Sequence, residues 1–259
     1  MNSKNQRVIG VIPARYGSTR LEGKVLAKIN GKPLIQWVYE YAKQSTILDD
    51  LLVAVDDPRV QECVEGFGGN AVMTSLHHKS GTDRVAEVVE KIAADIVVNI
   101  QGDMPLIDPL MIDEGVQPLL DHSEISMSTL KMHIKPENYA DPSVVKVVVD
   151  EQGYGLYFSR SLIPYPRNEI NLMIYEHIGL YIYRRDFLLM ISKLPQTYLE
   201  KVESLEQLRV LEKGYKIFVV ESKCKNAAVR GFMVDTPEDL IKAERLIKEL
   251  SKQTSRQPK

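Results

Sequence analysis

The sequence predicts an α/β fold: a Rossmann-like, mostly parallel sheet flanked by helices, with a β-rich insertion. In the first half of the 259-residue chain, short apolar runs alternate with amphipathic helical stretches, which is typical of a parallel sheet covered on both faces. From about residue 125 strand-like runs follow one another, which indicates a more antiparallel part. We expect a single domain over 1–259, with the β-rich part at about 125–200 and a flexible tail at about 252–259.

Each expected element has its own signal. Apolar runs predict strands at 8–12, 51–55, 72–74 and 96–100, and amphipathic stretches predict helices after Pro33, after Pro58 and over 82–94. The β-rich part predicts strands at 125–130, 144–149, 154–159 and 178–183. A helix over 204–213, a strand over 216–220 and a helix from near Thr236 complete the order. Thr-Pro-Glu-Asp gives the last helix an N-cap and a proline at its first position.

Composition narrows the class of protein. The formal net charge is -2 and opposite charges are well mixed, so neither nucleic acid nor an anionic membrane surface is expected as a partner. The N-terminus is polar, and no apolar run is long enough to span a membrane. Cys63 and Cys224 form no disulfide framework and lack the spacing of metal ligands. Because this pattern suits a reducing compartment, we expect a cytoplasmic protein.

A basic loop at 13–24 follows the first expected strand, and ligands of open α/β sheets bind at the carboxyl ends of strands. Arg15 and Lys24 can neutralise phosphate oxygens, and backbone amides near Gly17 can point at them. The loop is not a Walker A motif, because Val25 stands where that motif requires a hydroxyl. A solvated basic turn is the alternative interpretation, and the loop alone does not decide between the two.

Two aspartates are candidate ligands for Mg²⁺. Asp103 follows the strand at 96–100 in a Gln-Gly-Asp turn, and Asp235 lies just before the last helix. Mg²⁺ prefers one or two carboxylates together with phosphate and water. Two carboxylates from distant strand ends can also bring two ions to one phosphoryl group. Taken singly, a turn residue explains Asp103 equally well, and a helix N-cap neighbour explains Asp235.

Other polar residues suggest contacts to a substrate. Ser80-Gly-Thr-Asp-Arg84 opens a helix from which Arg84 can reach a base or ribose, although a capped helix start is the simpler interpretation of the motif alone. Strand alternation places His177 and Tyr181 on one face, where they can meet a hydroxylated substrate, and Arg160 can pair with a carboxylate. Ordinary packing is the alternative for these residues.

Together these segments resemble the 3-deoxy-manno-octulosonate cytidylyltransferase family, the CMP-Kdo synthetases of bacterial outer-membrane sugar biosynthesis. The resemblance spans nearly the whole chain and rests on eight ordered motifs: Ile12-Pro-Ala-Arg-Tyr-Gly-Ser-Thr-Arg-Leu21, Asn30-Gly-Lys-Pro33, Ser80-Gly-Thr-Asp-Arg84, Asn99-Ile-Gln-Gly-Asp103, Leu156-Tyr-Phe-Ser-Arg160, His177-Ile-Gly-Leu-Tyr181, Leu205-Glu-Gln-Leu-Arg209 and Val234-Asp-Thr-Pro-Glu-Asp239. It implies transfer of CMP from CTP to the acidic eight-carbon sugar Kdo, for lipopolysaccharide biosynthesis. It also implies a Mg²⁺ cofactor and a homodimer, with the β-rich part binding the sugar and forming the subunit contact.

The resemblance also implies roles for individual residues. Catalysis is assigned to Arg15, Lys24, Asp103 and Asp235, of which the two aspartates bind the metal. The residues implied to bind the nucleotide are Pro13, Ala14, Arg15, Lys24, Ser75, Arg84 and Gln101. Those implied to bind the sugar are Gln101, Arg160, His177, Tyr181, Glu206 and Gln207.

Three places depart from the family pattern, one of which is Gly231-Phe-Met-Val234, the approach to the final aspartate. Glu22 replaces the usual proline and brings an anion into the basic loop, so we expect its side chain to point outward. Met104 replaces the usual acidic residue after Gln-Gly-Asp, a position at which relatives using the 8-amino analogue of Kdo also depart. The alternatives are therefore that analogue (8-amino-3,8-dideoxy-manno-octulosonate), another acidic sugar or a sugar phosphate, or a non-catalytic nucleotide-binding protein of the same fold. Retention of both Asp103 and Asp235 speaks against the last of these.

Overall fold

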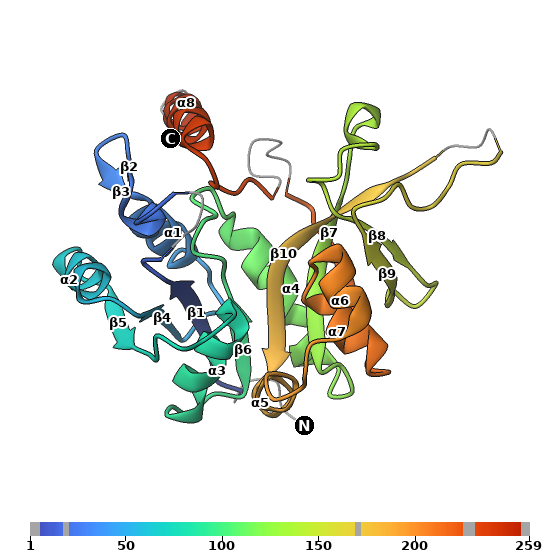
Figure 1. Ribbon diagram of the computed structural model, residues 1–259, viewed down its shortest axis with the longest axis horizontal. Helices are drawn as coiled ribbons and strands as arrows, with labels where there is room; N and C mark the ends of the chain where they lie inside the picture. The colour runs from blue at the N-terminus through green and yellow to red at the C-terminus, as the bar shows by residue number, and fades with distance from the viewer. Residues whose placement is uncertain (1–5, 18–20, 169–171, 225–230, 255–259) are drawn as a thin grey trace.

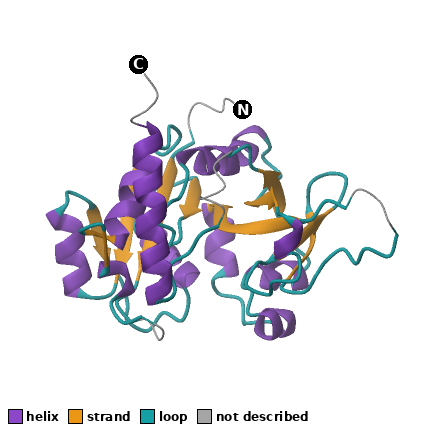
Figure 2. Ribbon diagram, turned by 90° about the horizontal axis from the view of Figure 1, so that it is seen from above, coloured by secondary structure: helices purple, strands orange, loops and turns teal. Residues whose placement is uncertain are grey.

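The computed structural model describes residues 6–17, 21–168, 172–224 and 231–254, and in these ranges a nine-stranded sheet forms the centre of the molecule (Figure 1). Its main path runs in the order β11-β7-β10-β6-β1-β4-β5, and β8 pairs with β10 and β9 beside this path. Helices lie on both sides of the sheet (Figure 2). The α/β fold predicted from the sequence is confirmed.

The parallel half contains four strands: β1 (Val8–Ala14), β4 (Asp50–Val55), β5 (Asn70–Met73) and β6 (Ile96–Asn99). β1 lies between β4 and β6, β5 pairs with β4, and every pair is parallel. The apolar sequence of β1 is buried on both faces, because Val8 and Ile12 pack into one core while Ile9 and Val11 pack into the other. Parallel pairing brings the carboxyl ends of β1, β4 and β6 to the same edge of the sheet.

The second half is arranged around β10 (Tyr175–Arg184), the long strand near the centre of Figure 1. β10 pairs antiparallel with β6, β7 and β8, and β8 pairs antiparallel with β9. β11 is parallel to β7. The bounds of these strands are β7 (Met127–His133), β8 (Lys146–Val149), β9 (Gly155–Ser159) and β11 (Phe218–Glu221). The mainly antiparallel pairing expected here is observed, and β10 joins both halves into one sheet.

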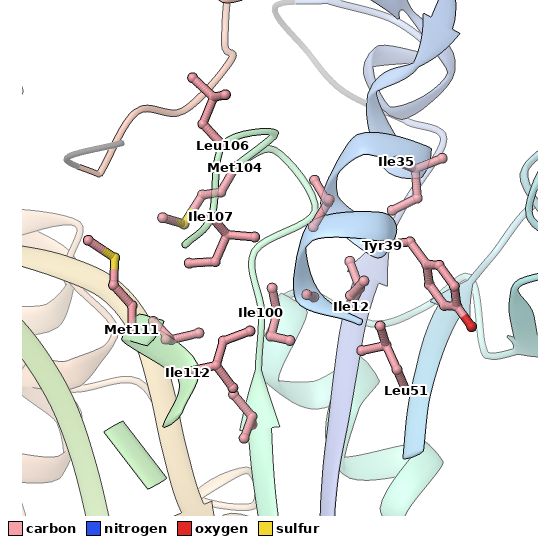
Figure 3. Close-up of a cluster of buried hydrophobic side chains, with 14 of the residues drawn as sticks. Ile12, Ile35, Tyr39, Leu51, Ile100, Met104, Leu106, Ile107, Met111 and Ile112 are labelled. Atoms are coloured by element: carbon pink, nitrogen blue, oxygen red, sulfur yellow. The ribbon is translucent and has the colours of Figure 1, made fainter. Parts of the chain in front are cut away.

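Two groups of helices cover the two apolar cores. One group consists of α1 (Leu34–Ala42), α2 (Pro58–Gly66), α4 (Pro109–Asp121) and α8 (Pro237–Thr254). The other consists of α3 (Gly81–Glu90), α5 (Arg185–Ile191), α6 (Tyr198–Glu203) and α7 (Gln207–Glu212). In the first core, Ile12 and Ile100 lie between Ile35 and Tyr39 of α1 and Met111 of α4 (Figure 3).

Several bounds differ from the sequence prediction. The helix expected over 82–94 ends at Glu90, and the helix expected over 204–213 is the shorter α7. The preceding helix α6 was not predicted, and it ends where Ser204 adopts a φ of 53°. The helices α4 and α5, the hairpin β2–β3 (Lys28–Ile29 and Lys32–Pro33) and the short 3₁₀ helix η3 (Pro136–Asn138) were not predicted. α8 continues to Thr254, so the expected tail begins in a helix, and 255–259 lie outside the described residues. Within the described ranges, no helix has both the length and the apolarity of a membrane span.

Candidate active site

A pocket of about 240 Å³ lies at the carboxyl ends of β1 and β6. It is lined by most of the residues expected at the nucleotide and the metal: Pro13, Arg15, Lys24, Arg84, Gln101, Asp103 and Asp235. Two other expected residues do not line it: Ala14 is fully buried, and the carbonyl oxygen of Ser75 accepts a hydrogen bond from Arg84. Residues 18–20 of the basic loop lie outside the described residues. Glu22 is exposed, as expected.

Lys24 lies between the two aspartates of the pocket. Its ammonium donates to Asp103 Oδ2 at 2.7 Å and to Asp235 Oδ1 at 3.0 Å, and its side chain is only 12% exposed. Asp103 Oδ1 is buried and has no hydrogen-bond partner within the described part of the chain. The structure therefore brings the two predicted metal ligands together, while the lysine expected at the phosphates neutralises the carboxylates instead.

Backbone contacts hold this group in place. The Val234 N–H donates to the Asp103 carbonyl oxygen at 2.9 Å, which fixes the approach to the last helix beside the Gln-Gly-Asp turn. Gly23 has a φ of 64° and begins the short 3₁₀ helix η2 (Lys24–Leu26). Its N–H also donates to the Tyr16 carbonyl oxygen at 3.1 Å. A left-handed φ favours glycine at this point, and the turn directs Lys24 toward the aspartates.

Gly102 allows the Gln-Gly-Asp turn to lie directly against β1. A Cβ atom at this position would be 2.6 Å from the Pro13 carbonyl oxygen, a distance at which the backbone would have to move. Because glycine has no Cβ, the turn can approach, and Asp103 reaches the pocket.

A buried ion pair supports the floor of the pocket. Arg84 Nη2 donates to Asp56 Oδ2 at 2.9 Å, and the arginine also donates to the Ser75 carbonyl oxygen at 3.3 Å. Asp56 Oδ1 accepts from the Tyr16 N–H at 2.9 Å, so the same carboxylate holds the basic loop. Burial lowers the pKa of Arg84, and the charge of Asp56 opposes this shift. The sequence analysis missed Asp56, although its place directly after Val55 at the end of an expected strand was a usable signal.

The helix α3 begins at the pocket wall. Ser80 is its N-cap, and a capping box is present in which the Ser80 hydroxyl accepts from the Asp83 N–H at 3.1 Å and the Asp83 carboxylate accepts from the Ser80 N–H at 3.2 Å. Ser80 and Gly81 also line the pocket. The capped helix start is therefore confirmed, and it lies at the pocket, where the binding role of the motif stays a prediction.

His78 also lines the pocket, and sequence reasoning did not assign it a role. Its Nε2 lies 2.6 Å from Glu87 Oε2, which also accepts from the Ser75 N–H at 2.8 Å. Hydrogen bonds from the Lys91 ammonium, the Ser75 amide and the His78 ring lower the pKa of Glu87 to about 2, so the carboxylate stays charged. The contact with this permanent anion fixes the His78 ring at the pocket.

A smaller pocket next to α3 contains three of the residues expected at the sugar: Tyr181, Glu206 and Gln207. The Tyr181 hydroxyl donates to Gln207 Oε1 at 3.0 Å, and Thr82 donates to Glu206 Oε2 at 2.8 Å. Burial raises the pKa of Glu206, and its Oε1 is buried without a hydrogen-bond partner in the described ranges. Thr82 follows Gly81 in the chain, so this pocket adjoins the larger one.

His177 contacts Gln207, one of the residues that line the smaller pocket. Its Nε2 lies 2.8 Å from Thr129 Oγ1, and its Nδ1 faces Gln207 Nε2 at 3.4 Å. Burial lowers the pKa of His177 to about 3, so the ring is neutral at pH 7. Since the Gln207 amide can only donate from nitrogen, Nδ1 is the acceptor and Nε2 carries the proton.

Arg160 lies apart from both pockets. Its side chain donates to the carbonyl oxygens of Glu203 at 2.9 Å and Pro142 at 3.0 Å, and it lines neither pocket. The pairing of Arg160 with a substrate carboxylate therefore stays a prediction that this arrangement does not support.

The chain matches known cytidylyltransferases over most of its length. A family model described as "Cytidylyltransferase" matches residues 9–217. The 3-deoxy-manno-octulosonate cytidylyltransferase of Geotalea uraniireducens (strain Rf4) is 50% identical over 255 residues, covering 93% of this chain and 100% of that protein. The chain belongs to the 3-deoxy-manno-octulosonate cytidylyltransferase family.

Other comparisons agree with this family. The enzyme of the same name from Geobacter sulfurreducens is 48% identical over 247 residues, 91% of this chain and 97% of that protein. A solved structure of CMP:2-keto-3-deoxy-manno-octonic acid synthetase complexed with CTP superimposes with a TM-score of 0.89 and 46% identity, covering 94% of this chain and 99% of that one.

Met104, which departs from the pattern expected of 3-deoxy-manno-octulosonate cytidylyltransferases, has a packing role in this structure. Its side chain is 1% exposed and lies in the first core with Leu106 and Ile107 (Figure 3). It is not among the residues that line either pocket. The sequence analysis treated this position as leaving the identity of the sugar open, and the structure buries the thioether in the core, outside the lining of both pockets.

Proposed function

We propose that this protein transfers the cytidylyl group of CTP to the anomeric hydroxyl of 3-deoxy-manno-octulosonate (Kdo) and releases pyrophosphate. The observation that carries the proposal is the contact of Lys24 with Asp103 and Asp235 in a strand-end pocket, in a chain that is 50% identical to an enzyme named for this reaction. An ammonium and two carboxylates suit the positioning and charge stabilisation of phosphoryl transfer, which needs no nucleophilic side chain.

We infer that Mg²⁺ is the cofactor, because the pocket offers suitable ligands. Asp103 and Asp235 provide hard oxygen atoms, and the buried Asp103 Oδ1 has no hydrogen-bond partner in the described ranges. Those ranges contain no cluster of three or more acidic, histidine or cysteine ligands, so phosphate oxygens would complete the coordination. When bound, Mg²⁺ would supply positive charge to the phosphates and lower the pKa of the attacking hydroxyl.

The protein's own groups would orient the triphosphate. Arg15 is an exposed cation of the pocket and can bind the outer phosphates. Ser80 and Gly81 present the N-terminal end of α3, where free amides and the helix dipole favour anionic groups. Lys24 and Arg15 would then stabilise the charge that develops on the leaving pyrophosphate.

The smaller pocket would bind the sugar. Tyr181, Gln207 and the neutral His177 form a hydrogen-bonded chain suited to a hydroxyl-rich ligand. Glu206, whose pKa is raised by burial, has one buried oxygen that lies 3.6 Å from Arg209 Nη2 but has no hydrogen-bond partner in the described ranges. This oxygen can share a hydrogen bond with a sugar hydroxyl.

Pyrophosphate release tests the proposal directly. The enzyme is assayed with CTP and Mg²⁺ against Kdo, its 8-amino analogue, a sialic acid and a sugar phosphate in parallel. We expect the highest kcat/KM with Kdo. CTP binding without pyrophosphate release for any of these acceptors would contradict the proposal and favour a non-catalytic nucleotide-binding protein.

Asp103→Asn tests the role of the carboxylates. We expect kcat to fall by about 10²-fold or more, since an amide cannot supply the charge that stabilises the phosphoryl group. Asp121→Asn, at the exposed C-terminal end of α4, is the matched control and should keep the parent rate. A near-normal rate of Asp103→Asn at saturating Mg²⁺ would rule out the assignment.

We also propose a homodimer formed through the β-rich part, in a cytoplasmic enzyme. The aromatic side chain of Tyr165 in that part is 81% exposed, and Leu156 of β9 is 61% exposed, which supports a contact with a second chain. Sedimentation equilibrium measures the mass, and Tyr165→Ser together with Leu156→Ser should shift a dimer toward monomer. The absence of a disulfide between cysteines of the described residues agrees with a reducing compartment.

A further inference from the structure

The contact between Lys24 and the two aspartates involves the oxygen atoms that a divalent cation would need. The ammonium lies 2.7 Å from Asp103 Oδ2 and 3.0 Å from Asp235 Oδ1. The side chains of Lys24, Asp103 and Asp235 are 12%, 23% and 28% exposed, so solvent screens this ion pair less than one at the surface. One cation of the protein itself therefore bridges two carboxylates that come from distant parts of the sequence.

An ammonium and a divalent cation cannot share this position. Mg²⁺ binds carboxylate oxygens at about 2.0–2.1 Å, so an ion that bridges the two aspartates would occupy the space of the Lys24 nitrogen and be repelled by it. Asp103 Oδ1 is buried without a hydrogen-bond partner in the described ranges, but a single oxygen is a poor site for Mg²⁺. The ammonium has to leave before one ion can bridge Asp103 Oδ2 and Asp235 Oδ1.

The phosphates of a nucleotide offer the ammonium another partner in the same pocket. Arg15 and Lys24 both line it, and a triphosphate bound there would bring several anionic oxygens close to Lys24. Its ammonium could then donate to phosphate while the carboxylates become available.

We propose that Lys24 is an internal counterion that competes with the divalent cation, and that nucleotide phosphates draw it away, so that metal and nucleotide bind together. This inference rests on the proposed function, because it assumes that Asp103 and Asp235 bind the metal and that CTP enters this pocket. Lys24 thereby couples the two ligands, in addition to stabilising the leaving group.

Binding of Mn²⁺ to the nucleotide-free enzyme, measured by electron paramagnetic resonance, tests the competition. Lys24→Met should bind Mn²⁺ at least about tenfold more tightly than the parent, because one positive charge about 3 Å from both carboxylates is lost. Lys24→Arg keeps the charge and should bind Mn²⁺ as weakly as the parent. Lys79→Met removes another cation that lines the same pocket and should change the affinity by less than about threefold.

A second readout separates this role from a structural one. Without divalent cations, Lys24→Met should bind CTP more weakly than the parent, because the phosphates lose a cationic partner. The affinities for Mn²⁺ and for CTP should therefore change in opposite directions. Circular dichroism checks the fold, and Lys24→Gln replaces Lys24→Met if the latter does not fold.

The outcomes distinguish the inference from the proposed function. Equal Mn²⁺ affinity in the parent and Lys24→Met, with Mg²⁺-dependent turnover of CTP and Kdo by the parent, would overturn the counterion proposal alone. Failure of every variant to bind Mn²⁺ even with CTP, with turnover independent of Mg²⁺, would overturn the metal assignment and this inference together.

Discussion

Asp56→Asn tests whether the buried ion pair with Arg84 supports the nucleotide pocket. Asp56 Oδ2 lies 2.9 Å from Arg84 Nη2, and the two side chains are only 10% and 3% exposed. Asparagine keeps the shape of the side chain and can still accept from the Tyr16 N–H, but it leaves the guanidinium without its countercharge. The variant therefore separates the effect of the Asp56 charge from the effect of the side-chain shape.

The expected loss of stability follows from desolvation. Removing one partner of a buried ion pair costs about 3–5 kcal/mol, because the remaining charge is still out of water. We expect about 3 kcal/mol here, since the asparagine oxygen still accepts one hydrogen bond. For a chain of this size that corresponds to a Tm lower by roughly 6–12 °C. The KM for CTP should also rise by about tenfold, because Asp56 anchors both Arg84 and the basic loop.

Thermal unfolding followed by circular dichroism and initial rates of pyrophosphate release measure these effects. Glu62→Gln, which removes an exposed carboxylate from α2, is the matched control and should leave the Tm unchanged. Asp56→Asn combined with Arg84→Met should be less destabilised than the sum of the single variants. A loss below about 0.5 kcal/mol in Asp56→Asn, or strict additivity in the double variant, would refute the reasoning.

Three further predictions concern stability and rate. Burial lowers the pKa of His177 from 6.5 to about 3, so as the pH falls the ring is protonated in the unfolded chain before it is protonated in the folded protein. The free energy of unfolding should therefore decrease below pH 6.5, by about 2 kcal/mol at pH 5. Urea titrations should show this loss in the parent but not in His177→Gln, and an equal loss in both would contradict it. Lys146 is fully buried, and its ammonium donates to three backbone carbonyl oxygens at 2.7 Å. Lys146→Met should therefore lower the free energy of unfolding by at least about 2 kcal/mol. A urea midpoint equal to that of the parent would contradict this prediction. Gly102→Ala should displace Asp103 and reduce kcat by about tenfold or more. Gly66→Ala, where a Cβ meets no atom within 4 Å, is the control and should keep the kcat of the parent. Equal kcat values for the two variants would show that the turn at Gly102 tolerates a Cβ.

The local periodicity of the sequence was sufficient to predict the α/β architecture. Alternating strands and amphipathic helices predicted the parallel half, because a strand buried on both faces must be continuously apolar, as β1 is. The same logic placed Arg15 and Asp103 near each other, since adjacent parallel strands end at one edge of the sheet. The short helix α6 was missed, and its end depends on a single residue, Ser204, whose left-handed backbone separates α6 from α7.

The partners of charged side chains were decided only by the tertiary structure. The family resemblance implied that Lys24 and the two aspartates are catalytic, but not that Lys24 bridges the aspartates. Nothing in the sequence indicated that Asp56 neutralises Arg84. Arg160 was expected at the sugar and instead donates to backbone carbonyl oxygens. The physical reason is that periodicity records which face of an element is apolar, whereas the partner of a charge depends on burial and on distances between segments far apart in the chain.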